Sequence, residues 1–288
     1  MPIGISEPDP IIRISKPDPI GKFKGLFYGD PGSGKTVLAG SADVCEFTGR
    51  ALMVDAEAGD KPLGKFYPDI DRVPVKDLKD FNDIYEFLRK HVKLKQILNG
   101  EIRSDKMSPE DAKKKMAELE SQLRGVEVKE PRIYNTVILD TLTEIQKYVM
   151  AHITGNDPDT IDFSGEFKMP TLNDWGRNSE IVRSIVRTFR NLDLHVIFTC
   201  HAAEVKDEQT GAVEILPSLP GRLAREVMGY VDVVGYLYVK ETDDGEFRNV
   251  LITRNTGKYQ AKDRFDALGP YIENPTMDKI IKKIKEAM

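Results

Sequence analysis

Cysteine is scarce in this 288-residue chain, which contains only Cys45 and Cys200. Two cysteines are too few for a disulfide framework, and these two lack the spacing of metal ligands. We therefore expect both to be reduced residues of a protein core.

Long apolar runs are lacking as well. No stretch approaches the roughly 18–20 consecutive apolar residues that a membrane-spanning helix needs. The N-terminus, with its repeated Pro-Asp-Pro, does not resemble a signal peptide. We expect no membrane partner and a cytoplasmic location.

An excess of positive charge is also absent, because the formal net charge is −5. This argues against a surface coated with basic residues for nucleic acid, although a local basic stripe is compatible with it. Hydrophobic residues make up 40% and charged residues 31%, as in an ordinary globular protein. The length suggests one α/β core with additions.

The most informative feature that is present is a phosphate-binding loop, residues 29–36, which fits the pattern G-x-x-x-x-G-K-[ST]. An apolar stretch precedes it and a helical pattern follows, as the motif requires. Its backbone amides and the helix dipole would hold phosphates, its lysine would add a charge and its threonine a hydroxyl for Mg²⁺. The nucleotide-binding residues expected are Gly29, Asp30, Pro31, Gly32, Ser33, Gly34, Lys35, Thr36 and Val37.

The rest of the chain alternates in the βαβ manner, which predicts an α/β fold with a mostly parallel central sheet flanked by helices. The Pro-punctuated residues 1–21 predict an extended arm along the domain or along a neighbouring subunit. The core is expected over residues 22–98 and 131–272, with a helix over 35–47. A short Lys-rich helix is expected in the C-terminal segment, residues 273–288.

Residues 99–130 are rich in Lys, Glu, Asp and Gln, and Ser108-Pro109 indicates a helix start. We expect an inserted helical hairpin. It is either a solvated arm without chemistry or a contact for a partner.

The run Tyr134–Thr141 is rich in β-branched and aliphatic residues and leads to an acid, which predicts a strand buried on both faces. An aspartate at the carboxyl end of such a strand points into the crevice where phosphates bind. Asp140 is therefore predicted to hold Mg²⁺ together with Thr36, as the Walker B acid.

A hydrolase also needs a group that orients or deprotonates water, and the residue after Asp140 is threonine. The strand Leu52–Asp55 delivers Glu57 near its carboxyl end, and Asp55 shares its parity on an extended chain. We predict Glu57 as the base and Asp55 as its support. Glu144 is the competitor, although an acid in the first turn of a helix is commonly an exposed residue favoured by the dipole.

These motifs resemble the RecA-like recombinase core, in which a glutamate at the matching place positions water. The chain looks most similar to the phage-encoded RecA-like ATPases that act with single-strand annealing proteins and lack the terminal domains of RecA. The resemblance implies a homo-oligomer, ring or filament, that hydrolyses ATP with Mg²⁺ in a bacterial or phage-infected cell. An annealing or single-strand-binding protein is the implied partner.

The resemblance also assigns His201, at the end of the strand that starts at Leu194, as a γ-phosphate sensor where RecA has glutamine. Residues 202–229 would then be a mobile loop that faces single-stranded DNA. A long loop without regular structure is commonly functional. A lid or a partner surface is the alternative, because few basic residues lie in this segment, namely Lys206, Arg222 and Arg225.

Further residues are candidates for DNA contact. Trp175 and Arg177 precede a helix on which Arg183, Arg187 and Arg190 share one face. This arginine row either tracks a phosphate backbone or forms a solvated helix face.

A basic turn follows the strand that begins at Leu251. In RecA-like assemblies, basic residues at a comparable place reach the phosphate held by the neighbouring subunit. Lys258, Lys262 and Arg264 are thus candidates to act in trans on hydrolysis, whereas the alternative for Arg254 is packing within its own subunit.

The sequence therefore predicts a Mg-dependent ATPase that binds single-stranded DNA and supports recombination or annealing. The alternative is a nucleotide-dependent switch or assembly ATPase that acts on a protein partner without DNA. A third hypothesis, a small-molecule phosphotransferase, fits less well, because Glu57 suits water activation. The chain contains no Asn-Lys-x-Asp motif, which argues against a GTPase.

Overall fold

The computed structural model describes residues 18–59, 61–102, 104, 107–156, 167–206, 211–243 and 245–288. Most of the expected N-terminal arm lies outside these residues. The strands are β1 (Lys24–Gly29), β2 (Ala51–Asp55), β3 (Asp71–Pro74), β4 (Thr136–Asp140), β5 (His195–Lys206), β6 (Val213–Pro217), β7 (Val233–Glu241), β8 (Phe247–Ile252), β9 (Lys262–Asp263) and β10 (Tyr271–Glu273). The α-helices are α1 (Lys35–Gly40), α2 (Lys61–Phe66), α3 (Leu78–Leu98), α4 (Pro109–Arg124), α5 (Leu142–Thr154), α6 (Leu172–Arg190), α7 (Leu223–Tyr230) and α8 (Met277–Glu286), and a 3₁₀ helix, η1, covers Ser41–Asp43.

The strands form one mixed sheet in the order β10-β8-β7-β1-β5-β4-β2-β3, with β6 paired to β5 and β9 to β7. The six strands from β7 to β3 run parallel, which confirms the predicted α/β fold. One strand, β5, separates β1 from β4. The carboxyl ends of β1, β5, β4 and β2 therefore meet at one edge of the sheet, where an α/β fold binds its ligand.

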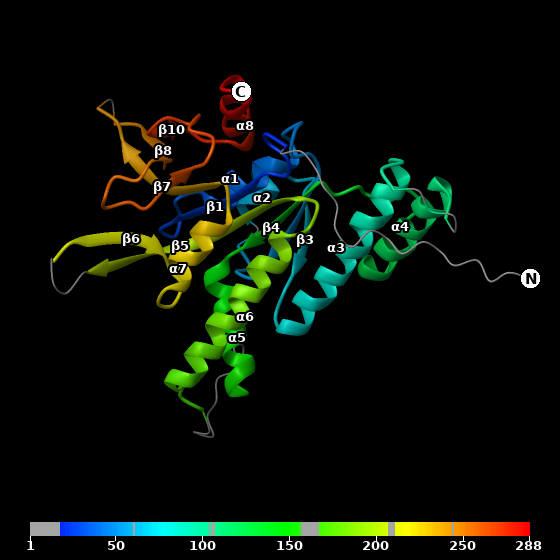
Figure 1. Cartoon of the computed structure of the whole chain (residues 1–288), viewed down its shortest axis with the longest axis horizontal. Coiled ribbons are helices and arrows are strands. Elements are labelled where there is room, and N and C mark those ends of the chain that lie inside the picture. The colour runs from blue at the N-terminus through cyan, green and yellow to red at the C-terminus, as the bar shows by residue number, and fades with distance from the viewer. Residues whose placement is uncertain are drawn as a thin grey trace, which may run out of the picture.

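Helices cover both faces of this sheet (Figure 1). One face packs against α3, α5, α6 and α7, and Leu26 and Tyr28 of β1 belong to that core. The other face packs against α1 and α8, and Phe27 belongs to that second core. Burial from both sides explains the apolar centre of β4, since all five of its residues are buried.

Helix α1 is shorter than the predicted helix over residues 35–47, because it ends at Gly40 and continues as η1. The backbone amide of Met277 donates to the Ser41 hydroxyl at 2.8 Å, which docks α8 here. The apolar face of α8, including Ile280 and Ile284, is buried in the second core. The predicted C-terminal helix is thus part of the core packing.

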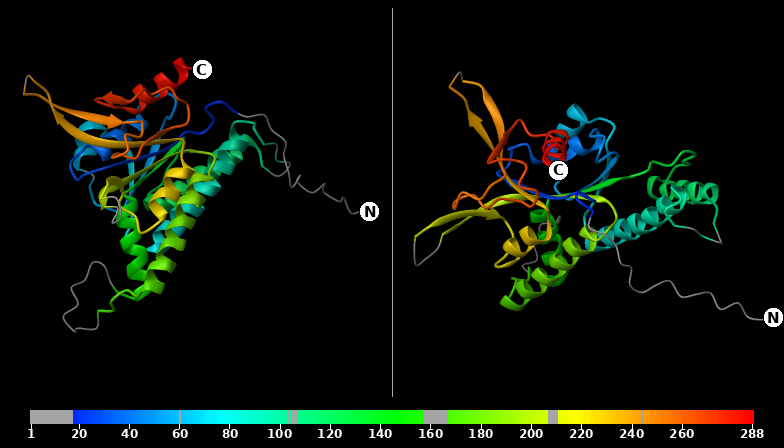
Figure 2. Two further views of the ribbon diagram at one scale, coloured as in Figure 1. Left: turned by 60° about the vertical axis from the view of Figure 1, so that its left-hand side comes forward. Right: turned by 45° about the horizontal axis from the view of Figure 1, so that its top comes forward.

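The inserted segment, residues 99–130, contributes one helix among its described residues and not a hairpin of its own. Helix α4 begins with a capping box between Ser108 and Asp111, at the predicted helix start. Its residues Ala112 and Met116 pack against Leu94 and Ile97 of α3. The hairpin is therefore formed by α3 and α4, which lie side by side at one end of the molecule (Figures 1 and 2).

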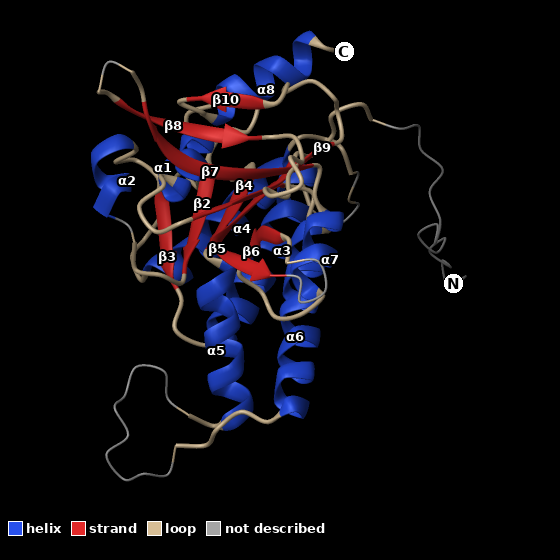
Figure 3. Cartoon of the chain, turned by 90° about the vertical axis from the view of Figure 1, so that its left-hand side faces the viewer, coloured by secondary structure: helices blue, strands red, loops and turns tan. Residues whose placement is uncertain are grey.

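The prediction of an irregular loop over residues 202–229 was wrong for its described part. Strand β5 continues past His201 to Lys206 and pairs with β6 in an antiparallel hairpin, and α7 follows. The polar composition of the segment hid this strand, because the hairpin extends beyond the sheet and its end is exposed. Helices α5 and α6 project together from the sheet in another direction (Figure 3).

Candidate nucleotide-binding site

The phosphate-binding loop joins β1 to α1 and depends on three glycines. Gly32 and Gly34 have φ of 79° and 91°, in the left-handed region that disfavours side chains. At Gly29 a Cβ atom would lie 2.1 Å from the carbonyl oxygen of Leu237 on β7, closer than atoms can approach. The sheet and the loop therefore require glycine at these positions.

Asn249 of β8 supports the loop from the side. Its Nδ2 atom donates to the carbonyl oxygen of Ser33 at 2.7 Å. The Ser33 hydroxyl is buried and makes no hydrogen bond with the described residues. A buried hydroxyl without a partner is costly unless a ligand satisfies it, so this atom fits a loop built to receive phosphate oxygens.

Lys35 lies at the start of α1 and is 5% exposed. Its ammonium donates to the carbonyl oxygens of Gly29 and Asp30 at 3.0 and 2.9 Å. Burial lowers the pKa of Lys35, while the carboxylates of Glu57 and Asp140 oppose that shift. A buried ammonium in such a loop is placed to bind phosphate.

Asp140, at the carboxyl end of β4, is 1% exposed. Its Oδ2 atom accepts a hydrogen bond of 2.8 Å from the Thr36 hydroxyl, and its Oδ1 atom accepts one from the Thr199 hydroxyl. Burial raises the pKa of Asp140, and these two hydrogen bonds oppose the rise. The structure thus brings together Thr36 and Asp140, the two predicted magnesium ligands.

Glu57 follows the end of β2 by two residues and is partly exposed. Asp55, which is buried, supports it, because the Glu57 amide donates to Asp55 Oδ1 at 3.0 Å. The other oxygen of Asp55 pairs with Arg72 Nε of β3 at 2.6 Å. Asp55 is therefore held between the Glu57 amide and Arg72 of β3.

His201 of β5 meets Glu57 across the carboxyl edge of the sheet. The Nε2 atom of His201 lies 3.2 Å from Glu57 Oε1, and this contact is the largest cause of the lowered pKa of Glu57. The backbone amide of His201 donates to the Thr143 hydroxyl at 3.0 Å. Its Nδ1 atom is buried and makes no hydrogen bond with the described residues.

The competitor Glu144 lies in the first turn of α5. Its amide donates to the Thr141 cap, and its carboxylate pairs with Lys147 at 2.6 Å. Both contacts are local to the helix. Glu144 is thus an acid of the first helical turn with local partners only, and Glu57 is the better placed of the two.

The donor set fits a magnesium nucleotide. The loop amides, the Ser33 hydroxyl and Lys35 face the place of an anion, and Thr36 with Asp140 offers the hard oxygen ligands that Mg²⁺ prefers. Among the described residues, no group of three His, Cys, Asp or Glu side chains could form a separate metal site. Cys45 and Cys200 are free and buried, as predicted, and burial raises the pKa of Cys200 to about 11.

The basic residues proposed to act in trans differ in their surroundings. Lys262 donates to the carbonyl oxygen of Val231 at 2.7 Å, and Arg264 pairs with Asp232 at 3.0 Å, near the amino end of β7. Arg254 pairs with Asp266 at 2.9 Å. Lys258 is exposed, like Arg254 and Arg264, and its ammonium lies over the ring of Tyr259.

The residues predicted to contact DNA are all exposed: Trp175, Arg177, Lys206, Arg222 and Arg225. Several basic groups nearby have intramolecular partners, since Arg225 pairs with Glu214 and Arg183 with Glu226 at 2.6 Å. The arginine row of α6 is therefore not entirely available for a phosphate backbone.

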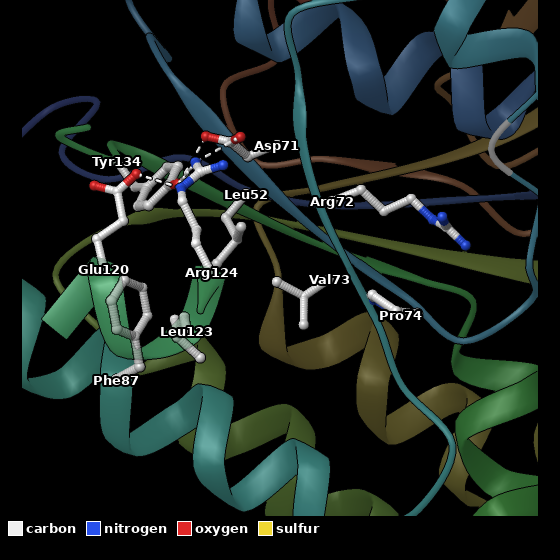
Figure 4. Close-up of a pocket in the computed structure, with 10 residues that line it drawn as sticks. All are labelled: Leu52, Asp71, Arg72, Val73, Pro74, Phe87, Glu120, Leu123, Arg124 and Tyr134. Atoms are coloured by element: carbon white, nitrogen blue, oxygen red, sulfur yellow. Dashed lines mark hydrogen bonds and ion pairs between the residues drawn. The ribbon is translucent and has the colours of Figure 1, made fainter. Parts of the chain in front are cut away.

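A separate pocket lies along the edge strand β3 and is lined by residues of β3, α3 and α4, not by the phosphate-binding loop (Figure 4). Asp71 of β3 accepts hydrogen bonds or ion pairs of 2.7 Å from Arg124, Arg132 and the Tyr134 hydroxyl. Glu120 also pairs with Arg124. These contacts attach α4 to the core.

Sequence reasoning missed two residues of the site, Thr199 and Asn249. The sequence contains a weak signal for each: Thr199 carries a hydroxyl within an apolar strand, and Asn249 carries an amide just before an apolar run. Their partners are distant in the chain, 59 and 216 residues away respectively. Only the sheet order brings them together.

The chain was compared with solved structures, curated proteins and protein families. Solved structures that match include the flagellar accessory protein FlaH from Methanocaldococcus jannaschii (11% identity, 83% of this chain and 82% of that chain, TM-score 0.34). Two others are the ATPase domain of G40P (12% identity, 88% and 80%, TM-score 0.34) and the RadB recombinase (12% identity, 88% and 87%, TM-score 0.35). A search of curated proteins gave no match.

Among the described residues, no helix has both the length and the apolar character needed to cross a bilayer. The family model described as an AAA domain matches residues 22–265, most of the chain. The chain therefore belongs to the AAA domain family and has the fold of a P-loop ATPase.

Proposed function

We propose that the protein hydrolyses ATP with Mg²⁺ and couples hydrolysis to single-stranded DNA in homologous recombination or strand annealing. The observation that carries this proposal is the Glu57–His201 contact of 3.2 Å beside Lys35 and Asp140. A carboxylate in that place suits activation of a water molecule, and a histidine that touches it suits sensing of the nucleotide.

Each residue of the site has a defined task in this proposal. The loop amides, Ser33 and Lys35 bind the phosphates, and Thr36 with Asp140 holds the metal. The bound Mg²⁺ would neutralise charge on the phosphate oxygens. Glu57 supplies the carboxylate that orients the water and accepts its proton.

Coupling to DNA is supported by the backbone around His201. The His201 carbonyl oxygen accepts a hydrogen bond of 2.8 Å from the amide of Ser218, just after β6. The β5–β6 hairpin, which carries Lys206, thus starts at His201 and is hydrogen-bonded back to His201 where it ends. A movement of His201 on nucleotide binding would reach the hairpin directly.

We further propose a cytoplasmic homo-oligomer, in which a basic residue of the neighbouring subunit completes each site. Lys258 is the preferred candidate, because its ammonium lies over the ring of Tyr259 whereas Arg264 is held in an ion pair by Asp232. An annealing or single-strand-binding protein is the proposed partner.

ATP turnover with and without single-stranded DNA tests the proposal, using the wild type, Glu57→Gln and Glu144→Gln. We expect DNA to stimulate the wild type, and Glu57→Gln to lose at least about 100-fold in turnover while it still binds ATP. Glu144→Gln is the matched control and should keep its activity. Unchanged turnover of Glu57→Gln would remove Glu57 as the base, and absence of both DNA binding and stimulation would remove the recombinase assignment.

A second candidate function is a nucleotide-dependent switch that acts on a protein partner. A cluster of exposed apolar side chains near the start of α6 favours it: Phe167 (57% exposed), Met169 (77%), Leu172 (92%) and Trp175 (40%). Such a patch on a protein surface commonly marks a partner. This candidate predicts slow ATP turnover that DNA does not alter.

A further inference from the structure

The β7–β8 hairpin has two different faces. Side chains alternate along a strand, so Leu237 and Val239 of β7 lie on one face and Tyr236 and Tyr238 on the other. Leu237 belongs to the core under α1, which identifies its face as the side of the phosphate-binding loop.

Asn249 of β8 lies on that same face, because it pairs directly with Val239 in the antiparallel register. Its Nδ2 atom bonds to the carbonyl oxygen of Ser33, and a Cβ atom added to Gly34 would come within 2.8 Å of it. The phosphate-binding loop therefore rests on this face of the hairpin.

Beyond Asn249 the same face is exposed, and Phe247 lies there directly opposite Glu241 of β7. Phe247 lies two residues before Asn249, about 7 Å farther along the strand. Phe247 is 71% exposed and Val239 is 45% exposed. A large aromatic side chain left in water beside a polar anion site suggests contact with a flat apolar group of a ligand.

The opposite face offers no equivalent surface, because its aromatic rings contact one another. Tyr259 stacks on Tyr236 with ring centroids 4.5 Å apart, and Tyr236 stacks on Tyr238 at 5.9 Å. Tyr28 contacts Tyr236 in turn, and its hydroxyl donates to the carbonyl oxygen of Gln260. These rings close that side of the hairpin.

We propose that Phe247 and Val239 form the subsite for the nucleobase of the nucleoside triphosphate whose phosphates the loop binds. This inference rests on the proposed nucleotide binding and extends it to the base. We assign a nucleobase to this subsite because Asn249 connects Phe247 and Val239 to the phosphate-binding loop. An aromatic ring can stack on any base, so the subsite would bind nucleotides with different bases and would not select among them.

The test compares a ligand with a base and one without, by calorimetry on the full chain. Phe247→Ala should weaken binding of Mg-ATP about 10-fold and leave binding of Mg-tripolyphosphate unchanged. Phe247→Trp should retain Mg-ATP binding, because it keeps an aromatic face. Phe66→Ala is the matched control: Phe66 is 52% exposed on α2, which packs near Gly40 at the far end of α1 from the loop.

Equal weakening of both ligands by Phe247→Ala, or no change in either, would overturn the subsite. Loss of self-association with unaltered Mg-ATP binding would also overturn it, since the face would then be an interface between copies. A wild type that binds tripolyphosphate as tightly as ATP contradicts the subsite alone. A wild type that binds neither contradicts the proposed nucleotide binding as well.

Discussion

The imidazole of His201 and the carboxylate of Glu57 join the ends of two strands that are not neighbours, because β4 lies between β5 and β2. The contact of 3.2 Å lowers the pKa of Glu57, and the nearby ammonium of Lys35 acts in the same direction. His201 is thus a positioning residue for Glu57 as well as the proposed sensor.

Replacing His201 with alanine should raise the pKa of Glu57 towards its ordinary value near 4.5, because the hydrogen-bond donor is lost. A ¹³C NMR titration of the Glu57 carboxyl measures this, with Glu57→Gln to assign the signal. The lowered pKa stabilises the folded protein above pH 4.5, and that contribution is lost as the pH falls through the folded pKa.

His201→Gln is the control for this titration, because glutamine retains a donor at a similar reach. We expect Glu57 to titrate in this variant closer to the wild type than to His201→Ala. An identical Glu57 titration in the wild type and His201→Ala would show that the imidazole does not act on this carboxyl.

Thr199→Val should weaken Mg²⁺ binding in the presence of nucleotide about 10-fold, as the loss of a residue that holds a metal ligand does. The Thr199 hydroxyl donates to the buried carboxylate of Asp140, whose pKa is already raised by burial. A Mg²⁺ titration at fixed ATP gives the affinity. Thr199→Ser keeps the hydroxyl and should behave like the wild type, so an equal loss in both variants would refute the assignment.

The sequence predicted the sheet and the phosphate site because both depend on local patterns. The glycines before Lys35 and the unbroken apolar strand before Asp140 each identify a strand end without knowledge of the neighbours. The carboxyl ends of parallel strands meet at one edge. The meeting of Thr36 and Asp140 follows from that rule alone.

What the sequence did not predict depends on contacts between distant segments. The β5–β6 hairpin was missed because its exposed residues lack the apolar alternation of a half-buried strand. On an extended chain, Asp55 and Glu57 would point to the same side. The strand ends at Asp55, however, and an ion pair with Arg72 of β3 holds the Asp55 side chain. Neither effect is encoded within a single segment.

Gly29→Ala should lower the free energy of unfolding by about 1–3 kcal/mol, as overpacking does, and weaken nucleotide binding. The new methyl group would lie 2.1 Å from a backbone oxygen of Leu237, which cannot rotate away. Thermal unfolding measures the change. In the control Gly176→Ala a Cβ atom meets nothing within 4 Å inside α6, so stability should rise by about 0.5–1 kcal/mol.

Mixing two inactive variants tests whether Lys258 acts on a neighbouring site. A Lys258→Ala subunit keeps its own Glu57, and a Glu57→Gln subunit still supplies Lys258 to its neighbour. If Lys258 acts in trans, the mixture should regain a substantial share of the wild-type ATP turnover that neither variant shows alone. Arg264→Ala, in which an ion pair with Asp232 is lost, should not be rescued in the same way.

Two buried histidines should make the fold sensitive to acid. His91 Nε2 accepts a hydrogen bond of 3.0 Å from the Tyr134 amide, and His195 Nδ1 accepts one of 3.0 Å from the Phe23 amide. Burial lowers the pKa of His91 to about 4 and that of His195 to about 3. Both imidazoles are therefore neutral acceptors in the folded protein.

Because an unfolded histidine titrates near 6.5, the unfolded chain binds more protons below that pH and the folded state loses stability as the pH falls. By pH 4 the loss should reach about 3 kcal/mol for each histidine. Urea unfolding between pH 7 and pH 4 measures it, with His91→Gln as the test, since glutamine can accept the same amide without titrating. His91→Gln should lose less stability over this range than the wild type, whereas the exposed control His152→Gln should follow the wild type, and equal slopes for all three would contradict a role for His91.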